Sequence, residues 1–139
     1  MTAKEYLGQV RKLNVRISIV REDIMRLRAR AESMTVTLSE KVQSSPRDTF
    51  SDNMAKLVDR EAQLESLCDV YDTMVAHILD EILQMPNELY SSILYKRYAS
   101  GLSLDEIAKI LHYSHDRVRH LHGEALAAFE RQFPNVKEL

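Results

Sequence analysis

The side chains best suited to chemistry in this chain are four polar residues between positions 115 and 120: His115, Asp116, Arg119 and His120. An arginine can form two hydrogen bonds with a guanine edge, and an aspartate can accept one from cytosine. Such residues contact bases when they lie on the outer side of a helix that enters the major groove of DNA. We therefore take all four as candidate base contacts.

Three further residues are candidates for contact with the DNA backbone: Arg117, Ser103 and Lys96. Arginine and lysine bind phosphate groups, and a serine at the start of a helix lies beside N–H groups that attract anions. Arg97 is also basic, but a salt bridge within the same domain is its structural alternative.

Two short helices are expected to position these residues. Ser103 followed by Glu106 is a capping-box pattern, and Ser114 can cap a second helix that begins at His115. His112 lies in the tight turn between them, where a positive φ is expected and histidine is comparatively tolerated. The inner faces are apolar: Leu104, Ile107, Ala108 and Leu111 in the first helix, and Val118, Leu121, Ala125, Leu126 and Phe129 in the second. This pattern predicts a helix-turn-helix.

A supporting helix is predicted directly before these two. Pro86 and Asn87 interrupt the preceding helix and start a new one, and Gly101 suits the left-handed position at its end. Its packing residues are Leu89, Ile93, Leu94 and Tyr98.

Heptad repeats dominate residues 1–85. Apolar residues recur at steps of three and four along residues 6–34 and again along 50–85, with Glu61 as the charged exception. The first seam consists of Tyr6, Val10, Leu13, Ile17, Val20, Ile24, Leu27, Ala31 and Met34. Two such seams predict an antiparallel coiled-coil hairpin. The repeat fades between Thr35 and Asp52, and Pro46 favours a loop there, so Ser51 or Asp52 would cap the second helix.

A second apolar strip, formed by Leu67, Val70 and Met74, lies beside the second seam. One partner helix would leave part of this widened face in water. We therefore expect a homo-oligomer, a dimer or larger, formed through residues 1–85.

Composition places the chain among all-α proteins. Of its 139 residues 45% are hydrophobic and 29% charged, with three glycines, three prolines and one cysteine, Cys68. No apolar run approaches the roughly 18 residues of a membrane span, and no secretory signal is seen, so we expect a cytoplasmic protein without membrane contact. We predict two regions: a helical hairpin over 1–85 and a helix-turn-helix domain over 86–139.

The charge is unevenly distributed. Residues 1–35 contain eight Lys/Arg and four Asp/Glu, residues 36–85 contain four and ten, and residues 86–139 contain seven of each with four of the five histidines. The basic first helix should therefore pair with the acidic second one through flanking charges. In residues 86–139, phosphate contacts must be few and well placed. Exposed arginines of the first helix are a solvated surface or, alternatively, a second surface for the DNA backbone.

Other chemistry is not supported. Four histidines, at 112, 115, 120 and 122, invite a metal site, but there is no second cysteine and no HExxH motif. Cys68 lies on the heptad seam, where it fills space. No glycine-rich phosphate loop or serine nucleophile motif is present. We therefore expect no enzyme activity, no cofactor, no metal and no small-molecule substrate.

Residues 94–129 also resemble the C-terminal, promoter-reading region of bacterial sigma factors. The matching residues are Arg97-Tyr98, Gly101-Leu102-Ser103, Glu106-Ile107-Ala108, Ser114, Val118 and Ala125-Leu126. The whole chain resembles small phage and prophage transcriptional regulators of Gram-positive bacteria, described as ArpU-like or RinA-like, through KEYLGQVRKLN, SDNMAKLVDREAQL and LHGEAL. The resemblance implies double-stranded DNA as the partner, control of late phage genes, and base contacts by His115, Asp116 and His120.

Two other functions stay open. The helix-turn-helix could dock on a protein such as host RNA polymerase, because its charge is close to balanced. A DNA-packaging recognition subunit, like the small subunit of a terminase, also combines a helix-turn-helix with a coiled coil.

Overall fold

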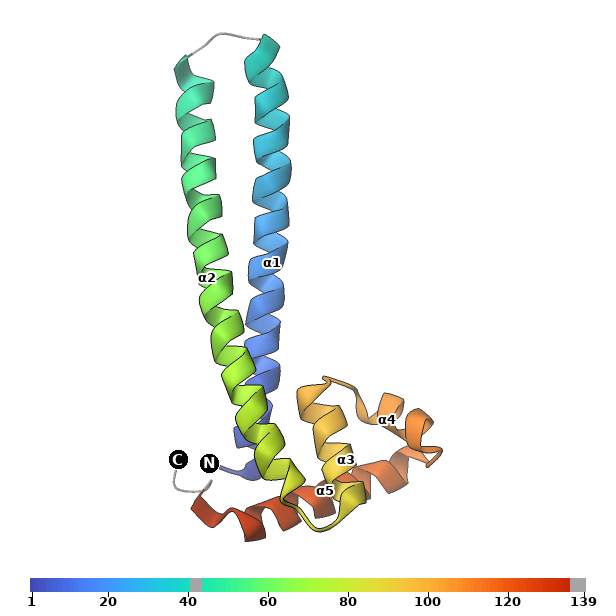
Figure 1. The fold of residues 1–139 in the computed structure, drawn as a ribbon. Helices are drawn as coiled ribbons and strands as arrows, with labels where there is room; N and C mark the ends of the chain where they lie inside the picture. The colour runs from blue at the N-terminus through green and yellow to red at the C-terminus, as the bar shows by residue number, and fades with distance from the viewer. Residues whose placement is uncertain (41–43, 136–139) are drawn as a thin grey trace. The chain divides into compact units, whose positions relative to one another are not determined.

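The computed structural model describes the backbone of residues 1–40 and 44–135 and the side chains of residues 1–33 and 49–135. It is all-helical, as predicted (Figure 1): the elements are α1 (Ala3–Glu40), α2 (Ser44–Leu83), α3 (Glu88–Leu94), the π-helical turn η1 (Tyr95–Ala99), α4 (Leu104–Leu111) and α5 (His115–Gln132). The long helices α1 and α2 form an antiparallel pair, and the three shorter helices follow. The chain divides into two compact units, Asn14–Val70 and Met1–Leu13 with Tyr71–Leu139.

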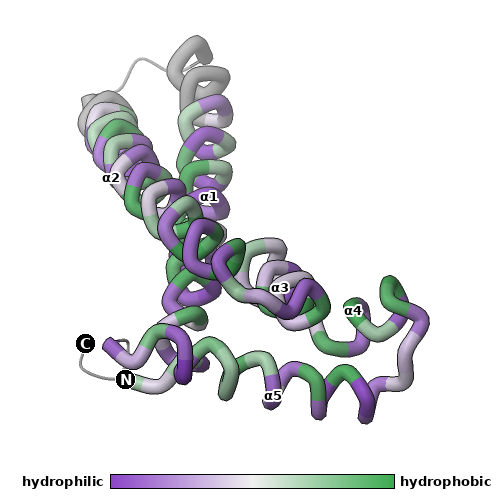
Figure 2. Tube along the Cα trace, turned by 60° about the horizontal axis from the view of Figure 1, so that its bottom comes forward, coloured by the Kyte–Doolittle hydropathy of each residue, from purple (hydrophilic) through white to green (hydrophobic). Residues whose placement is uncertain are grey.

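The unit of residues 14–70 is a two-helix hairpin. On α1 the predicted seam is confirmed from Ile17 to Leu27, because Ile17, Val20, Ile24 and Leu27 are all buried. Ala31 is half-buried, and the side chain of Met34 lies outside the described residues. The seam of α2 is buried less completely: Leu57 is buried, Leu64 and Cys68 are half-buried, and Met54 and Glu61 are exposed. Figure 2 shows the corresponding short bands of hydrophobic and hydrophilic residues along both helices.

Ion pairs between α1 and α2 occur in two arrangements: a base of α1 with an acid of α2, and an acid of α1 with a base of α2. Arg28 of α1 binds Glu61 of α2 at 2.8 Å, as the predicted basic-to-acidic pairing requires. Asp23 of α1 reverses that sense, because it binds Arg60 of α2 at 2.9 Å as well as Arg26 at 2.6 Å. Hydrogen bonds from these two arginines lower the pKa of the Asp23 carboxyl. All these groups are solvent-accessible, so the pairs select the register of the helices more than they stabilise them.

The prediction of a loop over residues 35–52 is wrong for every position that the structure describes there. Helix α1 continues to Glu40 and α2 begins at Ser44, so Ser51 and Asp52 lie inside α2 and do not cap it. Pro46 falls in the first turn of α2, where its missing N–H would have no partner within the helix. Residues 41–43 lie outside the described residues.

The other unit has one large hydrophobic cluster. Leu7 and Val10 near the start of α1 and Ile78 and Ile82 near the end of α2 pack in the same cluster as Phe129 of α5. Buried residues of this cluster therefore lie on both sides of residue 85. The predicted division of the chain into an oligomerisation region, residues 1–85, and a DNA-binding region, residues 86–139, therefore stays a prediction about function.

The contribution of this cluster to stability can be tested at Phe129. Its side chain is fully buried, with ring centroids 6.1 Å from Tyr6 and 4.8 Å from Phe133. Phe129→Ala should lower the free energy of unfolding by about 3–5 kcal/mol, because a cavity replaces the ring. The control is Leu83→Ala at a side chain that is 70% exposed, which should change it by about 0.5 kcal/mol or less. Urea unfolding followed by circular dichroism measures both, and equal effects would contradict the assignment.

Candidate nucleic-acid interface

The supporting helix begins and ends as predicted. The Asn87 side chain accepts hydrogen bonds from the N–H groups of Leu89 at 3.0 Å and Tyr90 at 3.2 Å. Gly101 has a φ of 73°, the left-handed conformation expected of it. The π-helical turn between them was not predicted. From within this turn the Arg97 guanidinium donates to the Leu102 carbonyl at 3.0 Å, so Arg97 holds the backbone just before α4.

Both predicted caps of the helix-turn-helix are present. Ser103 Oγ accepts from the N–H of Glu106 at 3.1 Å at the start of α4. Ser114 Oγ accepts from the N–H of Arg117 at 3.2 Å at the start of α5. Each cap satisfies a backbone donor that the helix itself cannot, and thereby fixes the residue at which the helix begins.

The turn between α4 and α5 depends on His112. This residue adopts φ 59° and ψ 39°, and its N–H donates to the carbonyl of Ala108. The expectation of a positive φ at a non-glycine residue is confirmed. The conformation closes α4 and directs the chain toward Ser114 within three residues.

A second hydrophobic cluster holds the three short helices together. Ile93 of α3, Ile107 and Ala108 of α4 and Val118 of α5 are all buried in it. Half-buried leucines surround them: Leu89, Leu102, Leu104, Leu111 and Leu121. Because Val118 is buried here, the opposite side of the first turns of α5 must face outward.

The surroundings of His122 do not resemble those of a metal ligand. His122 was considered with the other histidines as a metal ligand, yet it is buried, and its Nε2 lies 2.9 Å from the hydroxyl of Tyr98. Burial, with the positive charges of Arg97 and Lys4, lowers the pKa of His122 to about 4. Tyr98 and His122 are 24 residues apart, so only the packing of α5 beside η1 brings them together.

The four candidate base contacts all lie on the exposed side of α5. The exposed fraction of the side chain is 81% for Asp116, 63% for Arg119 and 52% for His115. Two of them have partners within the protein. His115 Nδ1 is paired with Asp105 of α4, a residue that sequence reasoning did not select, and Arg119 lies 3.8 Å from Asp116. Both pairs are exposed, so a DNA ligand could replace them at little cost.

The three candidate backbone contacts differ in their availability. Arg117 is exposed, and its guanidinium lies 5.0 Å from the centre of the Tyr113 ring. Ser103 is half-buried and caps α4, although its hydroxyl can still donate. Lys96 is half-buried and donates to Ser92 Oγ at 3.0 Å. Arg117 is thus the best placed of the three for a phosphate.

Comparisons of the chain with protein-family models, with curated proteins and with solved structures found no match. The resemblance to phage regulators therefore stays a prediction. None of the described helices has the length and apolar character needed to cross a membrane. Within the described residues, no three His, Cys, Asp or Glu side chains are grouped so that they could hold a metal ion.

The buried His122 predicts acid sensitivity. Unfolding returns its pKa from about 4 to the ordinary value of 6.5, so the unfolded chain binds more protons between these values. The contribution of neutral His122 to stability is therefore complete above pH 6.5 and falls as the pH is lowered toward 4. His122→Gln should reduce this loss by up to about 1.4 kcal/mol per pH unit. Urea unfolding between pH 7 and 5 measures it, with exposed His120→Gln as the control. Parallel profiles for His122→Gln and the unsubstituted protein would refute the prediction.

The left-handed conformation of His112 predicts that glycine is tolerated better than alanine at this position. His112→Gly and His112→Ala both remove the imidazole, but only glycine adopts a φ near 59° without a Cβ clash. The free energy of unfolding of the His112→Gly variant should therefore be about 1 kcal/mol higher than that of the His112→Ala variant. Thermal or urea unfolding decides this, and an alanine variant of equal stability would show that the turn relaxes.

Proposed function

We propose that this chain is a sequence-specific DNA-binding transcriptional regulator that inserts the start of α5 into the major groove. One observation carries the proposal. The second helix of a capped helix-turn-helix exposes His115, Asp116, Arg119 and His120 on one side while Val118 on the other side is buried. A helix held in this way presents hydrogen-bonding groups to base edges, since its N-terminal residues point away from the protein.

Each exposed side chain has a role that its chemistry supports. Arg119 can reach the two acceptors of a guanine once its 3.8 Å contact with Asp116 opens. Asp116 can then accept from a cytosine amino group. His115 and His120 offer ring nitrogens to neighbouring bases, whereas Arg117, Ser103 and Lys96 contact the phosphates beside the groove.

The charge balance of residues 86–139 implies that one copy binds DNA weakly. Seven basic and seven acidic residues give no broad positive surface. A homo-oligomer formed through residues 1–85 would present two such helices to spaced half-sites, and the second contact then gains from a high local concentration. By the resemblance described above, the regulated genes would be late genes of a phage or prophage.

A second candidate function is docking on a protein, such as host RNA polymerase. Ile110 of α4 is 51% exposed and Tyr113 in the following turn is 38% exposed, so these two side chains offer an apolar contact beside the start of α5. In this case Ile110→Asp should abolish docking, whereas substitutions at Arg119 should have no effect on it.

Selection of bound sequences from random DNA, followed by mobility-shift titration, tests the first function. Arg119→Ala should weaken binding to the selected site by about 1–3 kcal/mol and relax the preference at one base pair. Arg117→Ala should weaken binding to all sequences alike, because a phosphate contact carries no base information.

The matched control is Arg131→Ala, which removes the same charge from an exposed position near the end of α5. It should leave both affinity and preference unchanged. If low salt reveals no sequence preference for the unsubstituted protein, or if Arg131→Ala and Arg119→Ala behave alike, the proposed function is wrong.

A further inference from the structure

The side of α5 that carries two of the candidate base contacts leads to the start of α1. His115, Arg119 and His122 follow one another at steps of four and three, so they lie along one side of the helix. Two further steps of four lead to Glu130, whose carboxylate accepts a hydrogen bond from the N–H of Ala3 at 2.9 Å. The first turn of α1 therefore lies beside the side of α5 on which His115 and Arg119 are exposed.

Two exposed basic residues of α1, Lys4 and Arg11, flank this contact. They lie three residues before and four residues after Leu7, which is fully buried in the same hydrophobic cluster as Tyr98 of η1. Residues at these spacings are neighbours on a helix surface. Both charges therefore lie at the edge of the cluster that joins α1 to η1 and α5.

The buried Tyr98–His122 pair responds to the same two charges. Burial lowers the pKa of His122 to about 4, and the positive charges of Arg97 and Lys4 lower it further. Burial also raises the pKa of Tyr98, while the charges of Arg97 and Arg11 act in the opposite direction. The charged side chains that act on this pair are thus all basic, and two of them, Lys4 and Arg11, are exposed.

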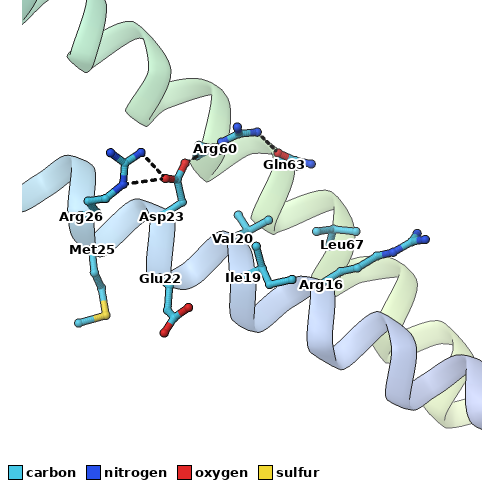
Figure 3. Close-up of a pocket in the computed structure, with 10 residues that line it drawn as sticks. All are labelled: Arg16, Ile19, Val20, Glu22, Asp23, Met25, Arg26, Arg60, Gln63 and Leu67. Carbon is cyan, nitrogen blue, oxygen red and sulfur yellow. Dashed lines mark hydrogen bonds and ion pairs between the residues drawn. The ribbon is translucent and has the colours of Figure 1, made fainter.

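The described part of the protein does not neutralise these two charges. Neither Lys4 nor Arg11 forms an ion pair with another described residue. The adjacent acid, Glu5, accepts a hydrogen bond from the N–H of Thr2 at 2.8 Å. Arginines of the hairpin differ, because two of them bind Asp23 beside a groove between α1 and α2 (Figure 3). Lys4 and Arg11 therefore offer their charges to an anionic partner.

We infer that Lys4 and Arg11 bind phosphates of the DNA strand that borders the major groove entered by α5. This inference rests on the proposed function and extends its DNA-binding surface into residues 1–13. His122 lies seven residues after His115, roughly 10 Å along the helix at about 1.5 Å per residue. The major groove is about 12 Å wide, so charges beside His122 lie at the distance of its bordering phosphates when His115 contacts bases. Residues 86–139 contain as many acidic as basic residues, so these two supply attraction that this region lacks.

Mobility-shift titration of the full chain at several salt concentrations tests this inference. Lys4→Ala and Arg11→Ala should each make the slope of the logarithm of affinity against the logarithm of salt concentration about 0.9 less steep. The double variant should make it about 1.8 less steep, because each lost phosphate contact releases fewer counterions. The ratio of affinities for selected and unrelated sequences should stay the same, since phosphates carry no base information. Lys4→Arg should keep the slope of the unsubstituted protein, because it keeps the charge.

Two exposed residues elsewhere serve as matched controls. Lys56→Ala and Arg131→Ala remove the same charges from α2 and from the end of α5, and both should leave the slope unchanged. Controls that change the slope as much as Lys4→Ala and Arg11→Ala would overturn the inference. So would unchanged slopes for these two variants in a protein that keeps its sequence preference. Failure of the proposed function looks different, because it removes the sequence preference and the effect of Arg119→Ala, whereas the slopes can still be compared on unselected DNA.

Discussion

Burial of one side of α5 is the constraint on which the rest of the candidate interface depends. Val118 near the start of the helix packs with Ile93 and Ile107, and Phe129 near its end packs with residues of α1 and α2. The two clusters fix the rotation of α5 about its own axis within this unit. Because the inner side is fixed in this way, the polar side chains at 115, 116, 119 and 120 must face solvent. The outward placement of these polar residues therefore follows from apolar packing.

Electrostatics has a subordinate role in this molecule. The ion pairs of the hairpin and of the helix-turn-helix lie among exposed groups, where each contributes little to stability and competes with solvent and salt. Their importance is in selection, because the pairs between α1 and α2 favour one register of the two helices. The same weakness keeps His115 and Arg119 available, because an exposed partner such as Asp105 can be exchanged for a ligand.

The buried Tyr98–His122 pair is the exception to this apolar organisation. A polar ring inside a core is tolerated only when it is hydrogen-bonded, and the Tyr98 hydroxyl meets that condition. Desolvation keeps the imidazole neutral by lowering its pKa to about 4. The pair joins η1 to α5 with a directional bond, which apolar contacts alone do not supply.

The sequence by itself determined the order of the main helices, the caps of the short helices and the outward side of α5. Ser103, Ser114, Asn87 and Gly101 act through neighbours within a few residues, so local pattern was sufficient to predict them. The loop over 35–52 was predicted wrongly because a proline in the first turn of a helix resembles a proline in a loop when only spacing is known. Tertiary structure alone decided the partners of His122 and His115 and the contact of Asp23 with Arg60, since each of these contacts joins separate elements whose approach depends on how whole helices pack.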